Sequence, residues 1–177
     1  MRSPPASPAR IEPKLRRSEI ERASRKPAAN LTAYDLYLRA LAQSYRYTEE
    51  GVAAAVALAR QALAIDPSYA PAAALVGWCR GLQRLQGWGA FSDADVAEAV
   101  RLSRQALEAE RNDANTIGLA AWPLFVLAGE AAMAAAALDR ALALNPNAAL
   151  AWLARGNIHA LRNQPEAAIH AIERARR

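Results

Sequence analysis

The chain has little of the chemistry on which most catalytic and metal sites depend. Its 177 residues include one cysteine, Cys79, and two histidines. A single cysteine excludes an intrachain disulfide and a zinc site built from several cysteines. We expect Cys79 to be buried, and we interpret His159 and His170, on separate predicted helices, as helix-surface or interface residues. No phosphate-binding loop, CxxC pair or HExxH sequence occurs, so we predict no enzyme, no cofactor and no metal.

Excess charge of one sign is absent from most of the chain. Residues 1–27 hold eight Lys/Arg and three Asp/Glu, which accounts for the whole net charge of +5, and residues 28–177 hold fourteen of each sign. The basic, proline-rich N-terminus lacks the apolar segment of a secretory signal, and we predict a cytoplasmic protein. We interpret residues 1–28 as a tail and helix left from an upstream domain or linker. A nucleic-acid or membrane-surface accessory acting through this tail is an alternative, although we do not expect nucleic acid as the main partner.

Aromatic residues make up only 6% of the chain and β-branched residues are sparse, whereas hydrophobic residues make up 53%. Alanine and leucine supply most of that content, and both are strong helix formers. The composition therefore predicts an all-α protein. The apolar stretch 118–138 could be taken for a membrane span, but it contains Glu130, which is costly in a bilayer. Because Gly129 and Glu130 also fall where a turn is expected, we predict two alanine-rich helices and no membrane span.

The chain contains internal repeats. Segments 59–72, 103–116 and 138–151 each read as a helix end, a turn and a new helix start. One alanine position, in residues 55, 99, 134 and 168, recurs after 44, 35 and 34 residues, and about ten extra residues lie between Gly77 and Ala99. The pattern resembles the tetratricopeptide repeat of 34 residues. We predict a right-handed superhelix of helical hairpins over 29–177, with repeats at about 33–69, 70–113, 114–148 and 149–177.

Small residues and prolines occupy the positions where the helices of such repeats cross or turn. Pro123 lies inside a predicted first helix, which it should kink, and Asn30 or Thr32 should cap the first helix of the array. The sequence ends within the last predicted helix, so that helix could pair with a second copy in a homodimer. The structural repeat positions are Ala40, Ala55, Ala62, Pro67, Gly77, Ala99, Ala106, Ala121, Ala134, Ala141, Pro146, Trp152, Gly156, Ala168 and Ala175.

Segment 10–41 carries a more specific resemblance. It is similar to the junction before the tetratricopeptide repeats in bacterial adenylate cyclase-like and winged-helix regulator proteins, which also contain a TolB-like domain. The resemblance covers about residues 10–177 and implies a C-terminal partner-binding or regulatory module in bacterial signal transduction. Their catalytic and DNA-binding domains are absent from this sequence, so we do not carry those activities over; a regulatory fragment of a nucleotide cyclase-like enzyme is an alternative. The matching residues are Arg25, Lys26, Pro27, Asn30, Leu31, Ala33, Tyr34, Asp35, Leu36, Tyr37, Leu38 and Arg39.

The resemblance to tetratricopeptide repeats also implies a binding surface. In such arrays the first helix of each repeat lines a concave face that receives a protein or peptide partner. Repeat phase places mostly apolar residues there, which predicts a groove for a hydrophobic or helical segment. Alternatively, the same side chains fill the interior of a short superhelix, and the sequence does not choose between the two. The predicted groove residues are Tyr34, Tyr37, Leu41, Trp78, Trp122, Phe125, Leu153 and Asn157.

Overall fold

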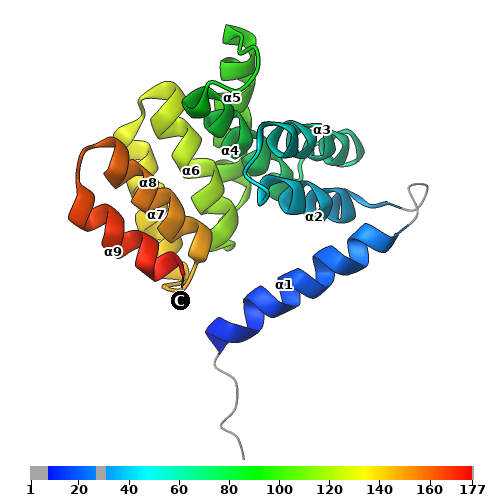
Figure 1. The fold of residues 1–177 in the computed structure, drawn as a ribbon, viewed down its shortest axis with the longest axis horizontal. Helices are drawn as coiled ribbons and strands as arrows, with labels where there is room; N and C mark the ends of the chain where they lie inside the picture. Colours follow the sequence, from blue (N-terminus) through cyan, green and yellow to red (C-terminus); the bar gives the residue numbers. More distant parts are fainter. Residues whose placement is uncertain (1–7, 27–30, 177) are drawn as a thin grey trace, which may run out of the picture.

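A computed structural model describes residues 8–26 and 31–176. Within these residues it contains helices and no strand, as predicted (Figure 1). The helices are α1 (Pro8–Arg25), α2 (Ala33–Ser44), α3 (Glu49–Ile65), α4 (Ala70–Gln86), α5 (Asp93–Ala109), α6 (Ala114–Ala128), α7 (Ala131–Leu144), α8 (Ala149–Leu161) and α9 (Pro165–Ala175).

Local sequence signals explain where several helices begin and end. Thr32 caps α2, as one of the two predicted candidates, and its hydroxyl accepts a hydrogen bond from the N–H of Asp35. Ser92 caps α5 in the same way. Gly87 and Gly129 end α4 and α6 with φ angles of 68° and 69°, a left-handed conformation that glycine adopts without strain. Asn30, the other predicted cap, lies outside the described residues.

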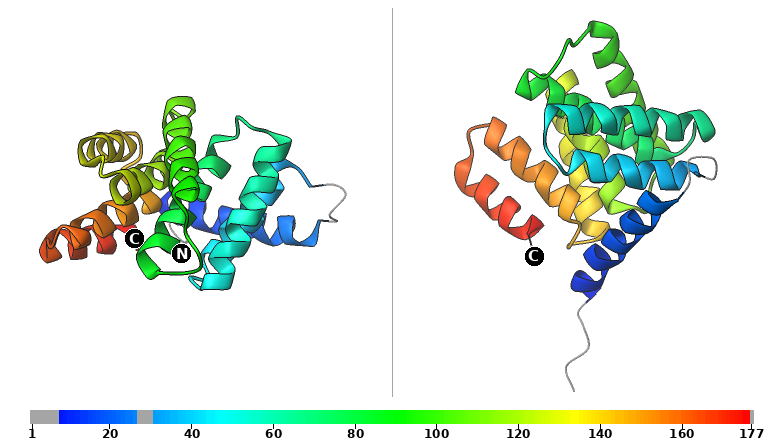
Figure 2. Two further views of the ribbon diagram at one scale, coloured as in Figure 1. Left: turned by 90° about the horizontal axis from the view of Figure 1, so that it is seen from above. Right: turned by 45° about the vertical axis from the view of Figure 1, so that its right-hand side comes forward.

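The helices α2 to α9 form four stacked hairpins. The pairs are α2–α3, α4–α5, α6–α7 and α8–α9, and each first helix packs on the preceding hairpin (Figures 1 and 2). Two equivalent hydrogen bonds join neighbouring hairpins: Gln105 donates to the carbonyl of Pro67 at 2.9 Å, and Arg174 donates to that of Pro146 at 3.3 Å. This stacking is the predicted tetratricopeptide-type arrangement. Each hairpin falls within one predicted repeat, whose exact limits stay a prediction.

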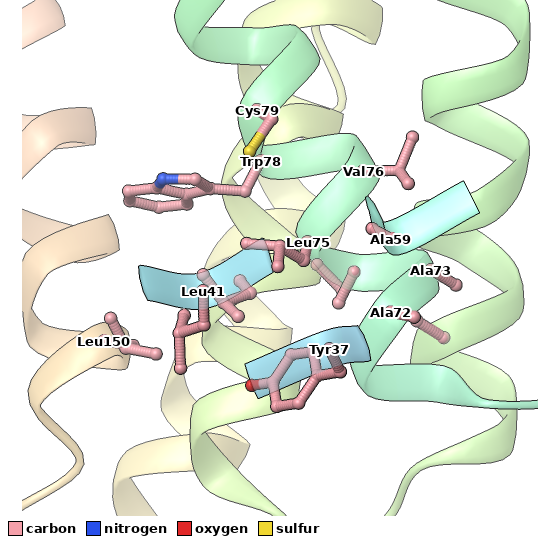
Figure 3. Packing of buried hydrophobic residues seen from close by; sticks show 14 of the residues in the cluster. Tyr37, Leu41, Ala59, Ala72, Ala73, Leu75, Val76, Trp78, Cys79 and Leu150 are labelled. Carbon is pink, nitrogen blue, oxygen red and sulfur yellow. The ribbon is translucent and has the colours of Figure 1, made fainter. Parts of the chain in front are cut away.

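Small side chains lie where the helices touch. The repeated alanines Ala55, Ala99 and Ala134 are fully buried, and so are Ala40 and Ala121 in the first helices. Because alanine adds little bulk, the helix axes approach closely, and one continuous apolar core includes residues from Ala23 to Ala154. Figure 3 shows part of this core. The remaining small positions of the repeat are Ala62, Gly77, Ala106, Ala141, Gly156 and Ala168, all buried, and Ala175, which is half-buried.

The extra residues of the second repeat lengthen α4 and form the connection between α4 and α5. Helix α4 extends to Gln86, and the connection 87–92 then leads to α5. In that connection Trp88 packs edge-on against Tyr47 of the first repeat, with ring centroids 5.9 Å apart.

Pro123 does lie inside α6, which continues to Ala128. No described helix is long and apolar enough to cross a membrane, and the stretch 118–138 divides into α6 and α7.

Helix α1 packs against α2. Its residue Ala23 is fully buried, and the Arg39 side chain donates a 2.9 Å hydrogen bond to the Ala23 carbonyl. Lys26, just after α1, pairs with the buried carboxylate of Asp35 at 2.5 Å. Three residues matched to the bacterial linker, Lys26, Asp35 and Arg39, therefore hold α1 against α2.

We expect alanine substitution to destabilise the protein where a glycine touches backbone, at Gly118, and to be tolerated where it touches a flexible side chain, at Gly156. A Cβ at Gly118 would lie 2.6 Å from Cα and 2.7 Å from N of Ala151, backbone atoms that cannot rotate away. At Gly156 it would meet the flexible end of the Ile172 side chain at 2.7 Å. Gly118→Ala should lose about 1–3 kcal/mol of unfolding free energy through overpacking. Gly156→Ala should change it little, because the ~1 kcal/mol gain in helix propensity offsets the contact. Urea unfolding of both variants checks this, and equal losses would contradict it.

The Asp35 carboxylate should make stability sensitive to acid. Its hydrogen bonds with Lys26 and Thr32 hold the pKa of Asp35 well below its usual range. The folded state therefore binds this proton less tightly than the unfolded state, so the stabilisation is present above the ordinary aspartate pKa of about 4 and is lost as pH falls below it. Asp35→Asn should lose about 1–2 kcal/mol at pH 7 and less at pH 3. Urea titrations at both values measure the difference; a deficit independent of pH would argue against this role.

Candidate partner-binding surfaces

The eight residues predicted to line a groove separate into two groups. Tyr37, Leu41, Trp78 and Trp122 are buried, with Trp78 6% and Trp122 1% exposed. They are core residues, so the structure favours the interior interpretation for these four.

The buried aromatic residues hold the inner helices together. The rings of Trp78 and Trp122 are tilted against each other with centroids 4.5 Å apart. A Cβ added at Gly81 would lie 2.6 Å from the Trp122 ring, so the missing side chain there makes room for the indole. Leu150 of α8 belongs to the same buried cluster as Tyr37 of α2, so these two residues are part of the core (Figure 3).

The other four predicted groove residues are accessible but do not form one line. Tyr34 lies on α2, where partial burial and then the nearby Glu19 carboxylate of α1 raise the pKa of its hydroxyl. Phe125 on α6 and Leu153 and Asn157 on α8 are half-buried. The accessible part of the predicted groove is therefore divided between the first repeat and the last two.

Grooves do occur between the second helices of neighbouring repeats. One, between α3 and α5, has a volume of about 360 Å³. Arg60 of α3 closes part of it through an ion pair with Glu98 of α5, in which Arg60 Nε lies 3.2 Å from a carboxylate oxygen. Its lining residues are Arg60, Leu63, Ala64, Pro67, Glu98, Arg101, Leu102 and Gln105.

The equivalent groove between α5 and α7 is larger and more apolar. Its volume is about 440 Å³. Met133 and Ala136 follow Glu98 and Arg101 by 35 residues, so apolar side chains replace charged ones at equivalent positions. No ion pair between α5 and α7 side chains crosses it among the described residues, because Arg104 pairs with Glu130, which precedes α7. Its lining residues are Arg104, Leu107, Glu108, Met133, Ala136, Ala137 and Arg140.

The α5–α7 groove combines apolar residues with the charged residues Arg104, Glu108 and Arg140. Met133 is 47% exposed, and Leu107 is half-buried beside it in the lining. Arg140 donates a 3.3 Å hydrogen bond to the Leu107 carbonyl and makes no ion pair within the described part of the chain. Sequence reasoning missed this groove, although the change from Glu98 to Met133 at the repeat spacing was a readable signal.

The residues with reactive side chains occupy structural positions. His159 Nδ1 lies 2.7 Å from Gln164 Oε1 at the end of α8, and the His170 ring packs edge-on against Trp152. Cys79 is fully buried in the core, as expected. Among residues 8–26 and 31–176, no group of three His, Cys, Asp or Glu could hold a metal ion.

Stacked hairpins with small residues at their crossings define the class of this chain, a tetratricopeptide-type helical repeat array. No family model and no curated protein matches the sequence. One solved structure with a similar arrangement is MamA from AMB-1 in crystal form P212121. That similarity has a TM-score of 0.46 and 18% sequence identity, over 94% of this chain and 90% of the other. At this level it carries nothing about function, and the class rests on the packing described above.

Burial should make Cys79 unreactive in the folded protein. Burial raises the pKa of its thiol to about 12, so almost no thiolate exists at pH 8. We expect no measurable reaction with a disulfide reagent in native buffer and complete reaction in denaturing urea. Ellman's assay with and without urea measures this, and rapid labelling of the folded chain would contradict the burial.

Proposed function

We propose that the chain is a protein-interaction scaffold that binds a helical segment of another polypeptide in the α5–α7 groove. The observation that carries the proposal is the apolar groove itself, which no ion pair between α5 and α7 side chains spans within the described residues. Its counterpart between α3 and α5 has the same helical frame, yet the Arg60–Glu98 pair spans it. Replacement of Glu98 by Met133 at the equivalent position leaves a surface suited to apolar side chains.

The groove also indicates the chemistry of the partner. An amphipathic helix could place an apolar stripe on Leu107, Met133 and Ala137, which share the lining. A carboxylate beside that stripe would meet Arg140, whose only hydrogen bond within the described residues is to a backbone carbonyl. Charge-assisted bonds of this kind are stronger than bonds to a neutral carbonyl, so an acidic residue would add affinity and orientation. The partner we propose is therefore an acidic amphipathic helix.

The resemblance of segment 10–41 to a bacterial linker supports a more specific setting. Lys26, Asp35 and Arg39 belong to the matched residues, and all three hold α1 on the array. A regulatory module of cytoplasmic signal transduction, with α1 as its connection to an upstream domain, is the setting we propose. The scaffold would then act by holding its partner rather than by catalysis.

Site-specific crosslinking tests the scaffold and locates its surface. A photoreactive amino acid is placed at position 136 in the groove, at 125 on the first helices, or at exposed position 53 on α3. In the cells that make the protein, we expect a crosslinked polypeptide from position 136 and none from 125 or 53. A crosslinked product from position 125 alone would place the binding surface on the first helices instead. Equal products from all three positions, or no product from any of them, would overturn the proposal.

The affinity of the captured polypeptide provides a second readout. Met133→Glu should weaken its binding at least about tenfold, because a carboxylate then replaces an apolar contact in the groove. The matched control Ala53→Glu adds the same charge at an exposed position outside the groove and should leave the affinity unchanged. Equal effects of the two substitutions would show a general charge effect instead of groove binding.

A further inference from the structure

A second cavity adjoins the α5–α7 groove. It lies between α5 and the end of α6 and has a volume of about 630 Å³. Arg104 and Glu108 line both this cavity and the α5–α7 groove, so the two meet along one side of α5. The cavity and the groove together are termed the α5 trough below.

One apolar stripe runs along the α5 trough. Val96 and Val100 line the cavity, and Leu107 lines the groove. They follow each other at intervals of four and seven residues, which places them on the same side of the helix. All three are half-buried, as is Leu127 of α6, which lines the same cavity as the two valines. The apolar surface suited to a partner therefore continues beyond the α5–α7 groove.

Two arginines of the α5 trough have no acidic partner in the part of the chain that the structure describes. Arg101, in the cavity, donates a 3.4 Å hydrogen bond to Gln105 of the same helix. Arg140, in the groove, donates to the Leu107 carbonyl. Leu107 follows Arg101 by six residues, a rise of about 9 Å along α5. The α5 trough thus offers two cations to carboxylates that lie nearly two helical turns apart.

The other charges of the α5 trough give it a direction. Arg104 is paired with Glu130, and it offsets the charge of Glu108, which lies four residues further along α5. Asp93 is exposed in the first turn of α5, eight residues or about 12 Å before Arg101, and forms no ion pair within residues 8–26 and 31–176. The unpaired carboxylate therefore lies at one end, and the two unpaired arginines lie in the middle and at the other end.

We propose that the partner of the scaffold is one amphipathic helix of about fifteen residues that fills the whole α5 trough. The proposal rests on the scaffold function given above. The lining runs from Asp93 to Glu108, a rise of about 23 Å, which a helix of that length spans. Its apolar side covers the stripe of two valines and a leucine. Two carboxylates six or seven residues apart bind the two arginines, and a basic residue near one end meets Asp93.

The groove alone is too short to hold a helix in one orientation. Its part of α5 extends from Arg104 to Glu108, a rise of about 6 Å or little more than one turn. A helix of so few residues is also unstable by itself in water, whereas about fifteen residues suffice for a stable one. Occupation of the cavity as well covers Val96 and Val100 and brings the partner to the second arginine, Arg101.

Paired crosslinking positions test the length of the site. In the full chain, a photoreactive amino acid is placed at exposed position 97, which lines the cavity, or at position 136 in the groove. We expect both to capture the same polypeptide in the cells that make the protein. Mass spectrometry should place the two attachment points about seven to eleven residues apart in one segment, because position 97 precedes groove residues 104–108 by that interval.

The outcomes at the two positions separate the length of the site from the scaffold function. A product from position 136 without one from position 97, or different polypeptides from the two, would overturn the fifteen-residue site and leave the scaffold function standing. No product from position 136 would overturn both.

Charge reversal tests the recognition pattern. A synthetic peptide that covers the captured segment is titrated against the full chain. Arg101→Glu should raise its dissociation constant at least about fivefold, because like charges then face each other. Replacing the peptide carboxylate opposite Arg101 with lysine should recover most of the loss. The matched control Arg84→Glu reverses an exposed arginine on α4 that lines neither the cavity nor the groove, and it should leave the affinity unchanged.

Circular dichroism verifies that each variant is folded. If Arg101→Glu binds the peptide like wild type while Met133→Glu weakens it, the partner is confined to the α5–α7 groove and the proposal is wrong. Failure of the lysine peptide to recover affinity for Arg101→Glu would contradict the paired carboxylates.

Discussion

Close approach between neighbouring first helices is the constraint on which the rest of the structure depends. At Gly118 the backbone of α6 comes so near to Ala151 of α8 that no side chain fits between them. At Gly81 the missing side chain admits the Trp122 indole instead. Helices with small side chains can pack without cavities in two ways: their backbones can touch, or a large aromatic ring can fill the space between them. Glycine and alanine therefore determine how tightly the inner layer of the array is packed.

Tight inner packing has a consequence for the outer layer. The first helices of neighbouring repeats pack on one another, whereas the second helices pack mainly on first helices and hardly on each other. Grooves therefore remain between α3 and α5 and between α5 and α7. The side chains along these grooves are free to differ between repeats. In one groove the Arg60–Glu98 ion pair spans the gap, and in the next Met133 takes the position equivalent to Glu98. The same framework thus carries a charged groove and a more apolar groove side by side.

The sequence predicted the helical framework better than it predicted which side chains are accessible. Alanine spacing at 99, 134 and 168 located the second helices, because each helix crossing requires a small residue at the same position of every repeat. The capping role of Thr32 was also readable from its chemistry. Accessibility was not readable, because Trp78 and Phe125 are both large and apolar at groove positions, yet only three-dimensional packing buries one and leaves the other half-exposed. The close contacts of Gly81 and Gly118 were not predicted, because they are made with the next repeat and lie outside the pattern of a single hairpin.

The tryptophan pair also gives the fold an internal optical reporter. Of the four tryptophans, only Trp78 and Trp122 pack against each other within the described residues, with ring centroids 4.5 Å apart, and they come from consecutive first helices. Indoles this close share electronic excitation, so their near-ultraviolet circular dichroism arises at the junction of the second and third hairpins. Fraying of α1 or α9 would leave that band intact, whereas separation of the central hairpins would abolish it. The chain thus carries a label-free means of distinguishing partial melting at its ends from rupture at its middle.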